Sequence, residues 1–288
     1  MARIVEVFET KPEASRVMIK QFDIDFDGLA VHCYEGGRGF PILMLHGSGA
    51  GTSSASNWAN VLDALAGNYH VFAADLIGFG RSARKPLPPY FDIALWTRQA
   101  QFLFDRISNG ANAGFIGHSL SGFLGLQLAA SRPNLIKLLV TGSAGTRFKI
   151  TPELQIAWTA PRSLEELRRM YESVVADASG LTEEFYLERL ATLNEGDYAD
   201  YFSSMFTGDK QVYLDQLVLS TADSARIASE TLFVHGLNDR IVPFAEATLP
   251  MLRSIATADA VLINRCGHGP AFEQPAKFLR AAHGLFGS

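Results

Sequence analysis

Six short runs of apolar residues, each bounded by Gly, Asp or Asn, have the length of a buried strand. They cover residues 40–46, 70–75, 113–117, 135–141, 231–235 and 260–263. Their hydrophobicity is continuous, which is typical of parallel strands covered on both faces. Two further segments, 16–24 and 29–35, show alternating hydrophobicity around Asp27-Gly28 and predict an antiparallel hairpin.

Between the apolar runs lie stretches in which apolar residues recur every three or four positions, as in amphipathic helices. These stretches are 57–66, 93–107, 120–130, 244–255 and 275–286. Alternating strands and helices predict an α/β fold with a mostly parallel central sheet and helices on both faces.

One long segment breaks this alternation. From about 145 to 228 no strand pattern occurs, and residues 163–176, 182–194 and 198–206 have the periodicity of amphipathic helices. Because the segment falls between the sixth and seventh core strands, we predict an inserted helical cap. The predicted domains are a core of 1–144 and 229–288 and a cap of 145–228.

Composition narrows the classes of function. A chain of 288 residues with 48% hydrophobic content can bury a sizeable core, and a net charge of −5 argues against a broad nucleic-acid or anionic-lipid surface. The first residues hold charges and lack a signal peptide's apolar stretch of about 7–15 residues, and no run reaches the roughly 18 apolar residues of a membrane span. We expect a cytoplasmic protein with a small-molecule substrate.

Only two cysteines, Cys33 and Cys266, are present, and they lack the spacing of metal ligands. Neither a disulfide framework nor a metal site is therefore predicted.

The strongest chemical motif is Gly117-His118-Ser119-Leu120-Ser121-Gly122, between a predicted strand and a predicted helix. A nucleophile elbow needs small residues around its serine because the chain turns sharply there. Ser121 stands where a second glycine is usual, and it is still small. The motif predicts Ser119 as a nucleophile and the Leu120 amide, at a helix start, as an oxyanion donor.

A serine nucleophile needs a base, and the base needs an acceptor that orients it. Asp239 and His268 each follow a predicted strand, on the edge where α/β proteins gather their sites. The order Ser…Asp…His is the one expected for the α/β-hydrolase fold. We predict a triad of Ser119, His268 as general base and Asp239 as its orienting acid.

Two glycine-containing loops complete the motifs. His46-Gly47-Ser48-Gly49 follows a strand and predicts Ser48 or Gly49 as the second oxyanion donor; the chain lacks the spacing of a nucleotide-binding loop. The 75–82 loop, DLIGFGRS, is interpreted as structural, with Asp75 capping or pairing locally.

Together these motifs, with HGxxD at 235–239 and RCGH at 265–268, resemble the α/β-hydrolase superfamily and, in detail, the meta-cleavage-product hydrolases. The resemblance implies a cofactor-free, oligomeric enzyme that hydrolyses a carbon–carbon bond in 2-hydroxy-6-oxo-dienoates from aromatic degradation. It also implies that Asn57 contacts substrate and that Arg189 grips the substrate carboxylate. On an exposed helix face Arg189 would instead pair with Glu188 or Glu184, and the sequence leaves both roles open.

Two pocket positions depart from the family pattern. His118 stands before the nucleophile where asparagine is usual, and Gly269 follows the base where tryptophan is usual. Histidine at the first position is common among esterases of this fold. A carboxylesterase or lactonase therefore remains an alternative, and a non-catalytic binding protein with this fold is a remote one.

Overall fold

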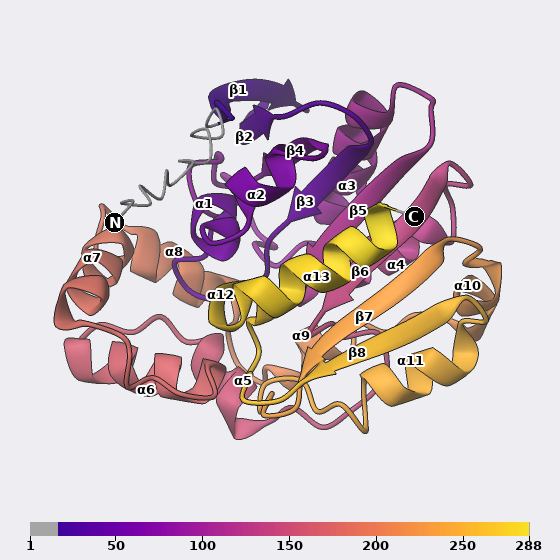
Figure 1. Ribbon diagram of the computed structural model, residues 1–288. Helices are drawn as coiled ribbons and strands as arrows, with labels where there is room; N and C mark the ends of the chain where they lie inside the picture. Colours follow the sequence, from indigo (N-terminus) through magenta and orange to yellow (C-terminus); the bar gives the residue numbers. More distant parts are fainter. Residues whose placement is uncertain (1–16, 288) are drawn as a thin grey trace, which may run out of the picture.

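The computed structural model describes residues 17–287 and contains an eight-stranded sheet in the order β1-β2-β4-β3-β5-β6-β7-β8 (Figure 1). β1 and β2 are antiparallel to their neighbours, and the pairs from β4 to β8 are parallel. The strands are β1 (Lys20–Phe26), β2 (Leu29–Gly36), β3 (Pro41–Leu45), β4 (His70–Ala74), β5 (Ala113–His118), β6 (Leu135–Thr141), β7 (Glu230–Gly236) and β8 (Ala258–Ile263). The predicted α/β-hydrolase architecture is confirmed.

The predicted hairpin is present as β1 and β2, which pair around Asp27 and Gly28. Both turn residues have positive φ, 55° and 78°, as a tight two-residue hairpin turn requires. The strand begins at Lys20, later than the predicted 16, and Arg16 lies outside the described residues.

Helices cover both faces of the sheet. On one face α3 (Ile93–Ser108), α4 (Leu120–Ala129) and α11 (Thr248–Ser254) contribute to a large apolar cluster that includes Phe104, Leu126 and Met251. On the other face α1 (Ser54–Trp58), α2 (Leu62–Ala66) and α13 (Pro275–Phe286) form a second cluster around Trp58 and Phe278. In Figure 1, α13 runs across the front of the sheet.

Between β6 and β7 the chain forms only helices, as predicted for the cap. They are α5 (Pro152–Ala157), α6 (Leu164–Val174), α7 (Glu183–Leu193), α8 (Tyr198–Met205), α9 (Gln211–Leu214) and α10 (Thr221–Arg226). Helices α6, α7 and α8 lie together beside the sheet, at the left of Figure 1. The division into domains at 144/145 and 228/229 stays a prediction.

Two predicted helices differ from the structure, and one short core helix was not predicted. The 57–66 helix is two short helices, because the Ser53–Ser56 capping box starts α1 earlier and the chain turns before α2. α11 begins at Thr248 instead of 244, after a series of turns. A short helix, α12 (Pro270–Glu273), precedes α13 and was not predicted. No helix within 17–287 is long and apolar enough to cross a membrane.

Candidate active site

Ser119 lies in a strained turn between β5 and α4. Its backbone has φ 53° and ψ −114°, a conformation that side chains rarely adopt. A Cβ added at Gly117 would lie 2.4 Å from the Ser121 carbonyl oxygen, and one at Gly122 would lie 2.6 Å from Ser143 Cβ. A Cβ at either position would therefore collide with its neighbours, and Gly117 is the small residue that a nucleophile elbow requires two positions before its serine.

Ser121 replaces the usual glycine and has a contact of its own. Its buried Oγ donates a hydrogen bond of 2.5 Å to the His46 carbonyl oxygen. This bond ties the first turn of α4 to the glycine-containing loop after β3. The substitution is accommodated because the hydroxyl finds an acceptor.

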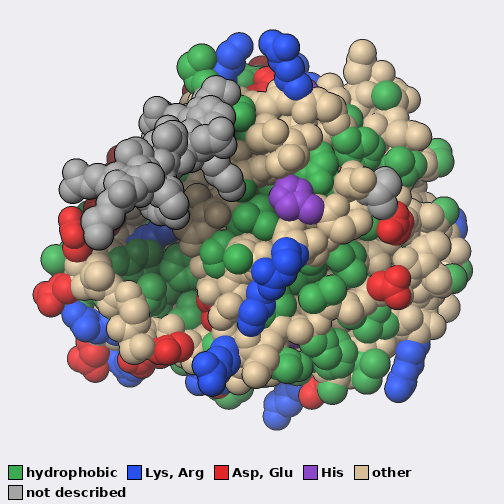
Figure 2. All heavy atoms as spheres, in the orientation of Figure 1, with side chains coloured by type: hydrophobic (Ala, Val, Ile, Leu, Met, Phe, Trp, Pro, Cys, Tyr) green, Lys and Arg blue, Asp and Glu red, His purple; other side chains and the backbone are tan. Residues whose placement is uncertain are grey.

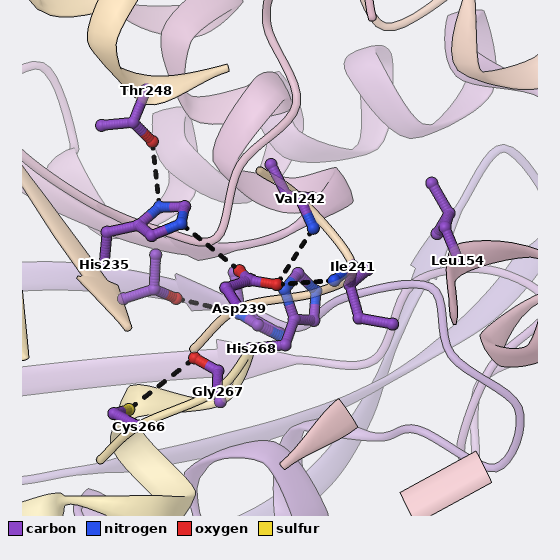
Figure 3. Close-up of polar contacts among 12 residues, drawn as sticks. Leu154, His235, Asp239, Ile241, Val242, Thr248, Cys266, Gly267 and His268 are labelled. Carbon is purple, nitrogen blue, oxygen red and sulfur yellow. Dashed lines mark hydrogen bonds and ion pairs between the residues drawn. The ribbon is translucent and has the colours of Figure 1, made fainter. Parts of the chain in front are cut away.

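Asp239 and His268 are joined by a hydrogen bond of 2.9 Å from His268 Nδ1 to Asp239 Oδ2 (Figure 3). The other carboxylate oxygen accepts the amides of Ile241 and Val242 at 2.9 and 3.0 Å. Burial alone would raise the pKa of Asp239, but the charge and hydrogen bond of His268 and the Val242 amide outweigh it and lower that pKa. The carboxylate is thus held ionised toward the histidine.

Ser119 and His268 line the same cavity of about 110 Å³. Within the described residues the Ser119 hydroxyl makes no hydrogen bond to His268, and such pairs often tighten only when substrate is bound. The ring of His118, the residue before the nucleophile, packs beside the base, with its centroid 4.7 Å from that of His268. The structure therefore brings all three predicted triad residues to one pocket edge.

The predicted oxyanion donors are the backbone amides of Ser48, Gly49 and Leu120. Among residues 17–287 none of the three donates to a protein acceptor, so all are free to bind a ligand oxygen. Ser48 and Gly49 line the Ser119 cavity, and Leu120 begins α4 directly after the nucleophile. The Ser48 hydroxyl accepts a hydrogen bond from Trp158 Nε1 of the cap at 3.0 Å.

The loop that carries Ser48 is fixed by His46 and Asp75. His46 Nε2 accepts the Leu76 amide at 2.9 Å, so Nδ1 carries the proton and donates to the Gly47 carbonyl at 2.7 Å. Asp75 accepts the amides of Ser54 at 2.7 Å and Arg81 at 2.9 Å. The interpretation of Asp75 as a structural residue is confirmed.

Asn57, His118 and Arg189 all border the Ser119 cavity and a second, adjoining cavity of about 110 Å³. Asn57 Oδ1 faces the Gly47 amide at 3.5 Å, and His118 Nδ1 is 2.9 Å from Thr141 Oγ1. Burial, and then the nearby His268, hold the pKa of His118 well below its ordinary value, so its ring is neutral. Gly269 lines the second cavity, and a Cβ added there would make ordinary van der Waals contacts with Phe272 Cβ at 3.6 Å and Glu273 Oε1 at 3.8 Å.

Arg189 is half-buried on α7, and its guanidinium lies over the Phe185 ring at 5.5 Å. No carboxylate within residues 17–287 forms an ion pair with it, so the expected alternative of pairing with Glu188 or Glu184 is not present. A cation without a paired carboxylate beside a cavity is suited to an anionic ligand.

The walls of the Ser119 cavity are otherwise mainly apolar and come largely from the cap. They include Leu154, Ala157, Trp158, Met170 and Ile241. Figure 2 shows the surface hollowed between the cap helices and the centre of the molecule, with hydrophobic side chains inside the hollow. The site can hold a ligand with an apolar part and an anionic part.

The sequence analysis missed several residues of this site. His235 lies on the far side of Asp239, with its Nε2 3.6 Å from Asp239 Oδ2 and its Nδ1 3.0 Å from Thr248 Oγ1 (Figure 3). Glu273 binds the loop of His268, and Trp158 binds Ser48. His235 stood in the HGxxD motif, but nothing in the sequence connected Trp158 or Glu273 with the triad.

No group of three potential metal ligands occurs within 17–287.

Comparison with known proteins agrees with this geometry. The model of the alpha/beta hydrolase family matches residues 42–281. The chain belongs to the α/β hydrolase family. Among similar sequences, the 2-hydroxymuconate semialdehyde hydrolase of Pseudomonas sp. (strain CF600) is 31% identical and the match covers 94% of this chain and 93% of that protein. The 2-hydroxy-6-oxo-2,4-heptadienoate hydrolase of Pseudomonas putida is 29% identical, with 88% and 91% covered.

Solved structures give the same result for this α/β hydrolase. The meta-cleavage product hydrolase from Pseudomonas fluorescens IP01 superposes with a TM-score of 0.87 at 29% identity, covering 92% of this chain and 97% of that one. The 2-hydroxy-6-oxo-6-phenylhexa-2,4-dienoate hydrolase from Rhodococcus sp. strain RHA1 superposes with a TM-score of 0.85 at 28% identity. The match covers 94% of this chain and 100% of that one. The resemblance stated from the motifs is confirmed.

Proposed function

We propose that this protein is a serine hydrolase that cleaves the carbon–carbon bond of a 2-hydroxy-6-oxo-dienoate. The observation that carries the proposal is a single cavity lined by Ser119, His268 and Arg189, which offers a nucleophile, a base and an anion-binding cation together. The similar proteins named above act on substrates of this class. In this proposal Ser119, His268 and Asp239 are the triad.

The reaction begins with ketonisation of the dienol in the pocket, which moves the proton of the 2-hydroxyl to C5. Ser119 Oγ then attacks the C6 carbonyl carbon, and its proton passes to His268. The new oxyanion is stabilised by the amides of Leu120 and of Ser48 or Gly49. Asp239 stabilises the imidazolium that forms on His268.

Breaking the C5–C6 bond leaves its electron pair on the departing dienolate, which takes up the proton from His268. The acyl group stays on Ser119 as an ester. Water then attacks this ester while His268 accepts its proton and returns it to Ser119 Oγ, releasing a carboxylic acid. The overall reaction consumes one water and yields a hydroxydienoate and an acid.

Arg189 would bind the C1 carboxylate through its planar guanidinium. Replacing Arg189 by Met should raise KM for the dienoate by about tenfold or more, since a charge-assisted hydrogen bond contributes about 1.5–3 kcal/mol. Neutral p-nitrophenyl esters should react at the unchanged rate. Arg169→Met is the matched control, because Arg169 on α6 is exposed and, among residues 17–287, forms an ion pair with Glu165 alone. An equal loss of kcat/KM for the dienoate and for the esters would contradict carboxylate binding by Arg189.

Comparison of kcat/KM for the dienoate with that for p-nitrophenyl acetate and butyrate distinguishes this function from a carboxylesterase. The esters need no ketonisation and use the same serine. Dienoate turnover well above ester turnover is expected. Fast ester cleavage without dienoate loss would make the protein an esterase and would assign His118 and Gly269 to that chemistry.

The cytoplasm is the proposed location, and a homo-oligomer is the assembly that the resemblance predicts. Cys33 and Cys266 are buried free thiols, which suits a reducing compartment.

A further inference from the structure

A half-buried carboxylate outside the triad, that of Glu273, binds the loop that carries His268. Glu273 Oε2 accepts the Gly267 amide at 2.8 Å, and Glu273 Oε1 accepts the Gly269 amide at 3.0 Å. The residues on either side of His268 are therefore held by one side chain. Since each oxygen binds a different amide, the carboxylate fixes both the position and the orientation of the loop.

The same carboxylate also binds the cap. Glu273 Oε2 accepts a third amide, that of Ala176, at 2.7 Å. Ala176 follows helix α6 of the cap, and Val174, the last residue of that helix, accepts the amide of His268 itself at 2.8 Å. The cap and the loop of the base thus share two connections, one through Glu273 and one directly between backbones.

The backbones at this junction are in close contact. A Cβ added at Gly267 would lie 2.5 Å from the Val174 carbonyl oxygen and 2.8 Å from the Ala176 nitrogen. Only glycine lets the loop approach the 174–176 segment so closely. Burial is the largest influence and raises the pKa of Glu273 above its ordinary value, while the hydrogen bonds from the three amides oppose this rise by favouring the carboxylate.

We propose that Glu273 is a positioning residue that ties the His268 loop to the cap, so that the general base is held in place only while the 174–176 segment is docked. This inference rests on the proposed role of His268 as base. Glu273 touches neither the substrate cavity nor the serine, and it acts through the loop. Movement of the cap is thereby coupled to the geometry of the triad.

Glu273→Gln tests the inference, because the amide group keeps the shape but turns an NH₂ toward backbone N–H groups. We expect kcat to fall about 10- to 100-fold, as for a catalytic group misplaced by up to about 1 Å, while KM stays within about threefold. Gly267→Ala, which separates the same two backbones without changing the carboxylate, should give the same pattern. Asp92→Asn is the control, since Asp92 is a partly buried carboxylate that accepts the Leu95 amide at the start of α3, away from the His268 loop; it should leave kcat unchanged.

Hydrogen exchange followed by mass spectrometry measures how well the backbone amides at this junction are protected, and it does not depend on activity. In Glu273→Gln the amides of 266–269 and of 174–177 should exchange faster together, and in Asp92→Asn neither segment should change. Unchanged exchange, or faster exchange on one side only, would overturn the coupling. Faster exchange in both segments with wild-type kcat would overturn the positioning role. Failure of the proposed function appears separately, as wild-type protein that turns over neither dienoate nor ester.

Discussion

At the scale of single residues, the chemistry of the site depends on how Asp239 is surrounded. Its side chain is 1% exposed, and it accepts two backbone amides and the His268 ring. These donors replace the hydrogen bonds that water would make, so the Asp239 carboxylate is stable in its ionised form although it is buried. It fixes His268 with the proton on Nδ1 and leaves Nε2 free for the nucleophile.

Asp239→Asn should preserve the shape of the site and remove most of its activity. An amide can donate to His268 Nδ1 and so favours the wrong tautomer, and it cannot stabilise the imidazolium. By analogy with other triads, kcat should fall on the order of 10³- to 10⁴-fold while KM changes little. Steady-state kinetics with dienoate and ester check this. A loss below about tenfold would mean that Asp239 does not orient the base.

At the scale of elements, the sequence predicted what local pattern determines. Buried strands with continuous apolar runs, the Asp27-Gly28 hairpin and the elbow around Ser119 were recognisable because each depends on neighbouring residues. The start of α1 was missed because its capping box has Ser56 where Glu or Gln is usual, and the short helix α12 was missed because its Glu273 makes hydrogen bonds to residues of other segments. The triad could be predicted from motif order, whereas the cap contact from Trp158 to Ser48 joins residues that no local pattern connects.

Two helical glycines offer a direct test of the elbow's packing. Gly122→Ala puts a methyl group 2.6 Å from Ser143 Cβ and should destabilise the protein by about 1–3 kcal/mol. Gly284→Ala in α13 meets no atom within 4 Å and should stabilise it by about 0.5–1 kcal/mol through helix propensity. Urea unfolding of both variants measures the difference. Equal effects would contradict the close contact of α4 with the chain after β6.

At the scale of the whole molecule, stability is linked to pH through buried histidines. Burial is the main cause that lowers the pKa of His46, His118 and His235 in the folded protein. In the unfolded chain these groups titrate near pH 6.5. Below that pH the unfolded state binds protons that the folded state does not, so stability is complete above about pH 6.5 and decreases as the pH falls.

Each of these histidines should reduce the free energy of unfolding by up to about 1.4 kcal/mol per pH unit below that point. Urea midpoints at pH 8, 7, 6 and 5 should therefore be level at first and then decline. His118→Asn removes one of the groups and should make the decline shallower. A constant midpoint from pH 8 to pH 5 would show that the buried rings do not stay neutral.

The central claim is that Ser119 carries out carbon–carbon bond hydrolysis in this pocket. The most direct measurement follows the loss of dienolate absorbance of a 2-hydroxy-6-oxo-6-phenylhexa-2,4-dienoate and the formation of its acid product, with the wild-type protein and with Ser119→Ala. We predict rapid turnover by the wild type and a loss of at least about 10³-fold in the variant. Wild-type protein that leaves the dienoate intact, or a variant that cleaves it at the wild-type rate, would contradict the account.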